Sequence, residues 1–268
     1  MVALLRRSLA PLTDETWKEV DEAAARVLKS QLTARGIVDF DGPCGWDLAA
    51  LNLGRLATSE EPGPHQVPWG RRLVLPLIET RVPFSLNQME LDSIARGADD
   101  ADLDPLEEAA QRIAAFEESA IYNGLEPGGI EGIIPQSVHP PIQLPKNTRD
   151  FPEAVALAVQ TMNQAGIDGP FVLVLGAEAW TGLMKSGAGG YPPQRVIGTL
   201  TYGAPRMSPA IQGGLLISAA KGNFELTVGQ DFSIGYASHD RDQVELYLTE
   251  SFVFRVLEPK ASVRLQPE

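Results

Sequence analysis

Residues 47–78 read DLAALNLGRLATSEEPGPHQVPWGRRLVLPLI, two strand-like runs joined by a polar turn. The runs Asp47–Ala57 and Gln66–Ile78 favour β-structure, and the segment SEEPGP at 59–64 has the composition of a loop tip. The stretch therefore predicts a long hairpin arm that is too thin to own a hydrophobic core. Because an isolated two-stranded hairpin is marginally stable in water, we expect the arm to lie on a partner surface.

A first helix is expected on the N-terminal side of the arm. Thr13 is a favourable N-cap, and apolar residues follow helical spacing from Trp17 to Leu32. We expect this amphipathic helix to continue to about Arg35, with Gly36 as the residue that closes it.

Two further helices begin with recognisable signals. Asp104 and Pro105 predict an N-cap and a first helical residue, and Gly124 predicts the end of that helix. Asp150 and Gly166 delimit another helix in the same way. One apolar face of the first of these helices is expected to contain Leu106, Ala109, Ala110, Ile113, Phe116, Ala120 and Ile121.

The C-terminal half is rich in short strands. Phe171–Leu175 is a wholly apolar run that predicts a buried strand. In the last strand, residues 244–256 follow a period of two, and Glu250 is the acidic residue on the apolar face. We expect its carboxylate to join a hydrogen-bond network near a sheet edge. Other strands are expected at 215–219, 224–228 and 232–236, which makes the chain an α+β protein.

Charge and composition exclude several classes of partner. The net charge of −13 and the pI of about 4.7 argue against a nucleic-acid-binding protein, which needs a basic surface. No stretch approaches the roughly 18 apolar residues of a membrane span, and no apolar run follows Arg6-Arg7 as an export signal requires. The single cysteine, Cys44, rules out an internal disulfide and fits a reducing cytoplasm. We therefore expect a cytoplasmic protein with no nucleic-acid or membrane partner.

A search for catalytic motifs returns none. The chain has no phosphate-binding loop and no serine-hydrolase elbow. Its histidines, His65, His139 and His239, are far apart and lack a second ligand at helical spacing. The sequence therefore predicts no catalytic residue, no cofactor and no metal site.

Several strings, taken in order, resemble one known family. They are RSLAPLT at 7–13, GP at 42–43, GW at 45–46, LPLIE at 75–79, DGP at 168–170, GQDFSIGY at 229–236 and TESF at 249–252. Together they resemble the family 1 encapsulins, the linocin- or bacteriocin-like shell proteins.

The resemblance implies a tailed-phage major-capsid-like fold with a peripheral domain, an axial domain and an extended loop. It places the peripheral domain, with the N-terminal helix, at 1–49, 77–132 and 222–256, the extended loop at 50–76, and the axial domain at 133–221 and 257–268. The chain would then be a structural protein that closes into an icosahedral nanocompartment of about sixty copies.

Family members enclose cargo enzymes, commonly ferritin-like iron oxidases or dye-decolourising peroxidases, which links them to iron storage and oxidative stress. A C-terminal peptide of the cargo docks between the N-terminal helix and the peripheral domain. Carried over to this chain, the docking groove would involve Leu28, Arg35, Asp39, Ile234 and Tyr236. Many relatives have phenylalanine at the position of Leu28, and some have an aromatic residue at the position of Met89.

A glycine-rich loop is expected at a symmetry axis of the shell. Its residues are Gly187, Ala188, Gly189, Gly190 and Tyr191, which have no charge. The resemblance implies that they line an opening with little electrostatic selection, and the alternative is a tight surface turn.

Two other assignments are compatible with parts of the sequence. A prophage major capsid protein would share the fold, and neighbouring genes would distinguish it from a nanocompartment. A bacteriocin or protease, as older names of the family suggest, would need a catalytic constellation that the sequence lacks.

Overall fold

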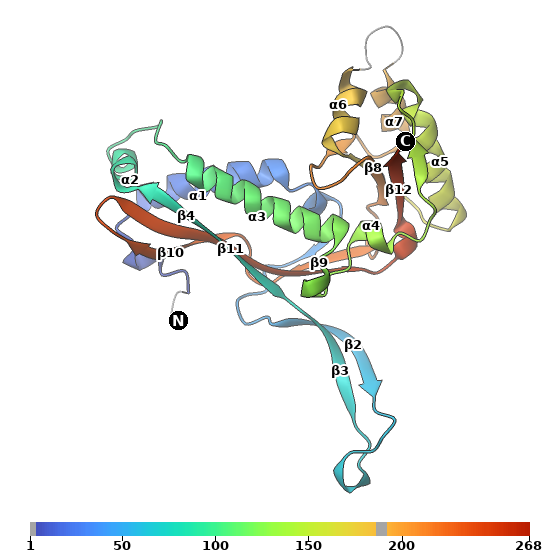
Figure 1. Ribbon diagram of the computed structural model, residues 1–268, viewed down its shortest axis with the longest axis horizontal. Helices are drawn as coiled ribbons and strands as arrows, with labels where there is room; N and C mark the ends of the chain where they lie inside the picture. Colours follow the sequence, from blue (N-terminus) through green and yellow to red (C-terminus); the bar gives the residue numbers. More distant parts are fainter. Residues whose placement is uncertain (1–3, 186–191) are drawn as a thin grey trace.

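The structure is a computed structural model that describes residues 4–185 and 192–268. Strands of its first sheet come from both halves of the chain (Figure 1). They are β1 (Asp39–Asp41), β4 (Ile78–Asn87), β9 (Phe224–Val228), β10 (Ser233–His239) and β11 (Gln243–Val256). The order is β1-β9-β11-β10, and β4 pairs with β11 over nearly its whole length.

One face of this sheet is covered by α1 (Asp14–Gln31) and α3 (Asp104–Asn123), and the short α2 (Gln88–Ala95) follows β4. Apolar side chains of the two long helices and of the sheet form one buried cluster. It includes Val20, Ala24, Leu28, Phe84, Leu86, Leu106, Ile113, Ile234, Tyr236, Leu246 and Leu248. The burial of this cluster is what holds the helices on the sheet.

A second sheet lies beside the first and forms the part with the C-terminus in Figure 1. Its strands, in order, are β5 (Ile142–Leu144), β12 (Ser262–Pro267), β8 (Gly214–Ser218), β6 (Phe171–Leu175) and β7 (Arg206–Met207). The helices near it are α4 (Ile133–Gln136), α5 (Phe151–Gln164), α6 (Ala177–Lys185) and α7 (Pro193–Leu200). All five residues of β6 are buried, which confirms the predicted strand.

The predicted hairpin arm is confirmed. It consists of β2 (Ala50–Thr58) and β3 (Gly70–Pro76), which pair only with each other and extend away from both sheets (Figure 1). None of residues 50–76 is buried within the chain. Leu51 and Leu75 at its base pack against a core cluster of the chain, and beyond them the arm is held in shape by its own ladder.

The first helix ends earlier than the sequence predicts. Thr13 is its N-cap as expected, because its Oγ1 accepts the Thr16 N–H at 3.2 Å. The helix stops at Gln31, and Gly36 lies in a separate 3-10 turn, Ala34–Gly36. The backbone leaves the helix here because the N–H groups of Thr33 and Ala34 donate to a carboxylate of α3 instead.

The second long helix differs from its prediction at two positions. Asp104 is its first helical residue, so the N-cap is Leu103, and Gly124 ends it at a φ of 86° as expected. Phe116, predicted on the buried face, is 39% exposed. Glu117 and Glu118 are buried on that face instead, and they build the site described below.

Several elements were not predicted from the sequence, among them β4, α2, α7 and β12. In β4, apolar residues alternate through Val82, Phe84 and Leu86, and Pro83 lies among them. The proline is tolerated because β4 pairs with β11 alone, so its other edge is free of strand partners in the described chain. No helix of the described residues is long and apolar enough to cross a membrane.

Candidate functional site

Three of the predicted groove residues lie together in one buried apolar cluster. Leu28 comes from α1, and Ile234 and Tyr236 come from β10; all three belong to the cluster between the helices and the first sheet. They are 8%, 3% and 9% exposed, respectively, so they lie at or just beneath the surface. Partly buried Val27, Leu32 and Phe232 continue this apolar surface outward.

Asp39 lies at the start of β1 and already has a partner. Its Oδ2 accepts the backbone N–H of Gly222 at 2.6 Å, which ties β1 to the turn before β9. This contact adds to the parallel pairing of β1 with β9.

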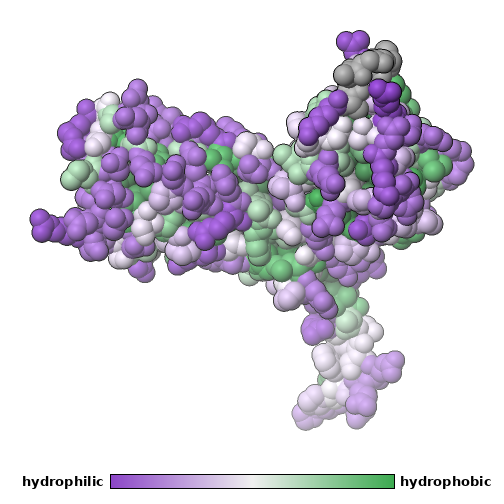
Figure 2. Space-filling view, turned by 45° about the horizontal axis from the view of Figure 1, so that its top comes forward, coloured by the Kyte–Doolittle hydropathy of each residue, from purple (hydrophilic) through white to green (hydrophobic). Residues whose placement is uncertain are grey.

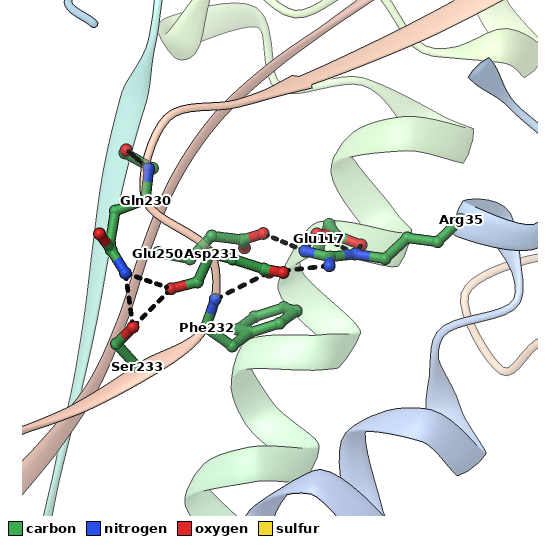
Figure 3. A network of polar contacts seen from close by, with 8 residues as sticks. Arg35, Glu117, Gln230, Asp231, Phe232, Ser233 and Glu250 are labelled. Carbon is green, nitrogen blue, oxygen red and sulfur yellow. Dashed lines mark hydrogen bonds and ion pairs between the residues drawn. The ribbon is translucent and has the colours of Figure 1, made fainter. Parts of the chain in front are cut away.

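Arg35 is the centre of an ion cluster of four side chains (Figure 3). Its Nε donates to both carboxylate oxygens of Glu117, at 2.9 and 3.0 Å. Its Nη1 donates to Asp231 at 2.8 Å, and its Nη2 contacts Glu117 at 2.6 Å and Glu250. The guanidinium also lies 4.5 Å from the ring centre of Phe232. One side chain therefore joins the turn after α1 to α3, to β11 and to the loop before β10.

The charges of this cluster do not balance if all four groups are ionised. Three carboxylates and one guanidinium give −3 + 1 = −2, and the side chains of Glu117 and Glu250 are 0% exposed. Burial, together with the charge and hydrogen bond of Glu117, raises the pKa of Glu250 well above its ordinary value. Among the described residues, Glu250 Oε2 has no hydrogen-bond partner. Glu250 therefore binds a proton more readily than an exposed glutamate does, and a proton there reduces the negative charge of the cluster.

Glu118 makes a second buried connection from α3. It accepts the N–H groups of Thr33 and Ala34 at 2.8 and 2.7 Å, and the hydroxyls of Thr33 and Ser208 at 2.5 and 2.8 Å. Burial raises its pKa, although these hydrogen bonds act in the opposite direction. Every oxygen of this carboxylate is engaged, as a structural role requires.

Sequence reasoning named Arg35 and Glu250 separately and missed Glu117, Glu118 and Asp231. The predicted network around Glu250 exists, but it lies at an inner strand, because β11 has neighbours on both sides. A signal for Glu117 was present: it follows Ala110 and Ile113 at helical spacing, on the apolar face of α3. A glutamate at a core position needs a buried partner.

The ion cluster around Arg35 and the hydrogen bonds of Glu118 are suited to holding helices and strands together. The other positions that the sequence singled out add no reactive group to them. The five residues predicted to line a pore, 187–191, lie outside the described residues. Over the ranges 4–185 and 192–268, no group of three or more His, Cys, Asp or Glu side chains is placed to hold a metal ion. Met89 is 71% exposed at the start of α2.

Comparison with known proteins gives the same picture for the fold. The chain is similar to solved structures of a virus-like particle from Pyrococcus furiosus (TM-score 0.63, 16% identity, covering 92% of this chain and 97% of the other). It is also similar to the Microbacterium phage Oxtober96 structure (TM-score 0.58, 10% identity, covering 89% and 92%). These likenesses confirm the predicted α+β, phage-capsid-like fold.

Curated proteins found by sequence have higher identity to this chain than these solved structures have. The type 1 encapsulin shell protein of Rhodospirillum rubrum is 45% identical over 268 residues, which cover 98% of this chain and 96% of the relative. That of Rhodococcus erythropolis is 38% identical, covering 97% and 98%. Residues 1–253 match the model of the Linocin_M18 family, described as encapsulating protein for peroxidase. The chain therefore belongs to this family, and it is an encapsulin shell protein that forms a capsid-like assembly of its own copies.

Proposed function

We propose that the shell built from this chain encloses a cargo enzyme, which a C-terminal peptide of the cargo holds on the shell's inner wall. The family description, encapsulating protein for peroxidase, supports a peroxidase as one class of cargo. An iron oxidase of the ferritin type is the other class that the sequence led us to expect. In this proposal the chain is a structural protein and not an enzyme, about sixty copies close one icosahedral shell, and the shell works in the cytoplasm.

The proposal includes the division into domains that the sequence led us to expect. The first sheet with α1 and α3 would be the peripheral domain, the second sheet with α5 to α7 the axial domain, and the arm the extended loop. The loop 187–191 would line an opening at a fivefold axis.

The observation that supports the docking proposal is the apolar cluster that α1 and β10 share, against which partly buried Val27, Leu32 and Phe232 pack. Leu28 and Ile234 come from two different elements and belong to the same cluster, with partly buried Phe232 beside them. A peptide with apolar side chains would bury them against this surface, and recognition would be set by a few such anchors.

Arg35 and Asp39 contribute in a different way from the one first expected. The guanidinium of Arg35 is neutralised by buried carboxylates, and Asp39 accepts the Gly222 N–H. We therefore assign to them the positioning of Phe232 and β1, and not a direct charge contact with the peptide. The stacking of Arg35 on Phe232 at 4.5 Å fixes where that ring can lie.

The test uses a monomeric reporter fused to the C-terminal peptide of the enzyme encoded beside the shell gene. Leu28→Ala and Phe232→Ala shells should assemble and co-purify with about thirtyfold less reporter at limiting concentration, because each removes an anchor of roughly 2 kcal/mol. Asp39→Ala should cause a smaller loss. Leu157→Ala, at a 49% exposed position of α5, is the control and should load normally. Equal loading of all four shells would place the docking site elsewhere.

A prophage capsid protein, the second assignment compatible with the sequence, shares this fold. The 45% identity to a named shell protein over 98% of the chain favours the nanocompartment.

A further inference from the structure

The two sheets share one apolar cluster where they meet. It takes side chains from β9 and β11 of the first sheet and from β6 and β8 of the second, among them Leu226, Phe252, Val174 and Leu215. Figure 2 shows two lobes with a notch between them, and hydrophobic residues gathered where the lobes join the base of the arm. The first lobe contains the first sheet with α1 and α3, and the second lobe contains the second sheet. Apolar burial holds the lobes together, but it is non-directional and does not by itself select one angle between them.

A directional contact crosses the same junction through Glu118 of α3. Its Oε1 accepts the N–H groups of Thr33 and Ala34, in the turn between α1 and β1, at 2.8 and 2.7 Å. Its Oε2 accepts the hydroxyl of Ser208 at 2.8 Å. Ser208 directly follows β7, and its N–H donates to the carbonyl of Leu175 at the end of β6, at 3.0 Å. One carboxylate therefore joins a turn of the first lobe to the edge of the second sheet.

Arg206 of β7 makes a second contact across the junction. Its Nη1 donates to the carbonyl of Thr33 at 3.2 Å. Gly36 leaves room for this guanidinium, because a Cβ at that position would lie 2.5 Å from Nη1. Farther along α3, the Asn123 side-chain amide donates to the carbonyl of Ala210 at 2.8 Å. The segment 206–210 of the second lobe is thus fastened to the first lobe at three points, through Arg206, Ser208 and Ala210.

The contacts of Glu118 and Arg206 with residues 33–34 and with Ser208 are here called the interlobe joint. Glu118 and Ser208 are buried, and both oxygens of the carboxylate accept hydrogen bonds. A buried network whose groups are all paired disfavours any arrangement that breaks one bond, because the freed group cannot turn to water. Rotation of one lobe against the other would move Ser208 and Arg206 away from the turn. The joint therefore selects one angle among those that the apolar cluster allows.

We propose that the interlobe joint sets the curvature of the shell, and so the size of the particle into which the copies close. If each copy contacts its neighbours through both lobes, the angle between the lobes sets the tilt from one copy to the next. A wider range of angles would let the same chain close into particles of several sizes. The proposal rests on the shell assembly, and it assigns Glu118 as the positioning residue that makes the particles uniform.

The experiment measures the size distribution of purified shells by mass photometry and electron microscopy. Ser208→Ala removes one hydrogen bond across the joint, which changes the ratio of two arrangements about fivefold, so particles outside the main size class should become about fivefold more frequent. Glu118→Leu should broaden the distribution further. Glu118→Gln should keep it narrow, because the amide oxygen can accept the two N–H groups and the amide nitrogen can donate to the hydroxyls.

The matched control is Ser137→Ala. Its hydroxyl donates to the carbonyl of Ser262 in β12 at 2.8 Å, a bond of the same length that stays on the side of the second sheet. This variant should lose a similar amount of stability in thermal unfolding of the dissociated subunit, and its shells should keep the size of the unaltered chain. A change of size that follows Ser208 and not Ser137 separates the angle between the lobes from stability.

The outcomes also separate the joint from the shell assignment. Shells of one unaltered size from both Ser208→Ala and Glu118→Leu, or an equal broadening by Ser137→Ala, would overturn the proposal and leave the shell assembly intact. If Glu118→Leu does not fold, the comparison of Ser208→Ala with Glu118→Gln and Ser137→Ala decides. An unaltered chain that forms no closed particle would overturn both the joint and the shell.

Discussion

Glu117 and Glu250 lie 133 positions apart in the sequence, yet both carboxylates bind one guanidinium, that of Arg35, and both side chains are completely buried. The pair belongs to α3 and to the inner strand β11, so the contact fixes the helix on the sheet. Its cost is a buried excess of negative charge, which a proton on Glu250 reduces. This makes the stability of the subunit depend on pH.

The first prediction concerns that dependence. In the folded chain the pKa of Glu250 lies above its ordinary value of 4.5, mainly through burial. Between the two values the folded state keeps a proton that the unfolded state releases, so stability falls as the pH rises through this window. Glu250→Gln, which cannot ionise, should give a shallower decline of the thermal midpoint between pH 5 and the alkaline limit. Parallel profiles for the two proteins would contradict the assignment of the proton.

The second prediction concerns Arg35. Arg35→Met leaves three carboxylates without their cation, and we expect a loss of about 3–5 kcal/mol in the free energy of unfolding. Arg35→Lys should recover only part of it, because an ammonium group cannot bind several carboxylates in fixed geometry. Urea unfolding of the dissociated subunit measures both. Adding Glu250→Gln to Arg35→Met should return some stability, and a strictly additive loss would argue against direct coupling.

The third prediction concerns Gly235 of β10, which pairs with Tyr247 of β11. Gly235→Ala should destabilise the subunit by about 1–3 kcal/mol, because the added Cβ overlaps the Tyr247 ring. Gly198→Ala in α7 is the matched control: its nearest neighbouring atom would be 3.9 Å away, so alanine should be neutral or slightly stabilising there. Thermal unfolding of both variants is the measurement. Equal melting temperatures for the two variants would mean that the Tyr247 ring moves aside freely.

A fourth prediction concerns the arm. Deleting Arg55–Gly70 should leave the fold of both sheets intact, since no residue of 50–76 is buried, but it should block closure of the shell. Leu56→Ser with Trp69→Ser, at positions 57% and 55% exposed, should weaken assembly without lowering the stability of the free subunit. Size-exclusion chromatography measures whether shells close, and circular dichroism measures whether the subunit is folded. Shells of normal yield and melting temperature from the deletion variant would show that the arm does not join copies.

The fifth prediction concerns the loop 187–191. If it lines an opening, Gly189→Asp should change the entry of small ions into iron-loaded shells without changing assembly, because it introduces a ring of charge. Iron uptake followed by absorbance is the measurement. Uptake that stays constant for Gly189→Asp and for Gly189→Lys would favour a surface turn.

Several features were determined by the sequence alone because their causes are local. The N-cap at Thr13, the helix end at Gly124 and the buried strand Phe171–Leu175 depend on neighbours within a few positions, and the structure confirms each. The arm could also be predicted from the sequence, since two strand-like runs joined by a polar tip are too thin to enclose a core of their own. The order of short strings along the chain was enough for the family.

Only the tertiary structure decided how distant residues combine. Arg35 and Glu250 are 215 positions apart, and no local pattern relates them. The early end of α1 depends on Glu118, which accepts the N–H groups that the helix would otherwise use. The hydrogen bond from the Tyr247 hydroxyl to the Leu4 carbonyl likewise joins two segments that are far apart in the sequence. Such contacts form when a helix packs on a sheet whose strands come from both halves of the chain. The periodicity of apolar residues along the sequence does not say which strands pair or which helix covers them.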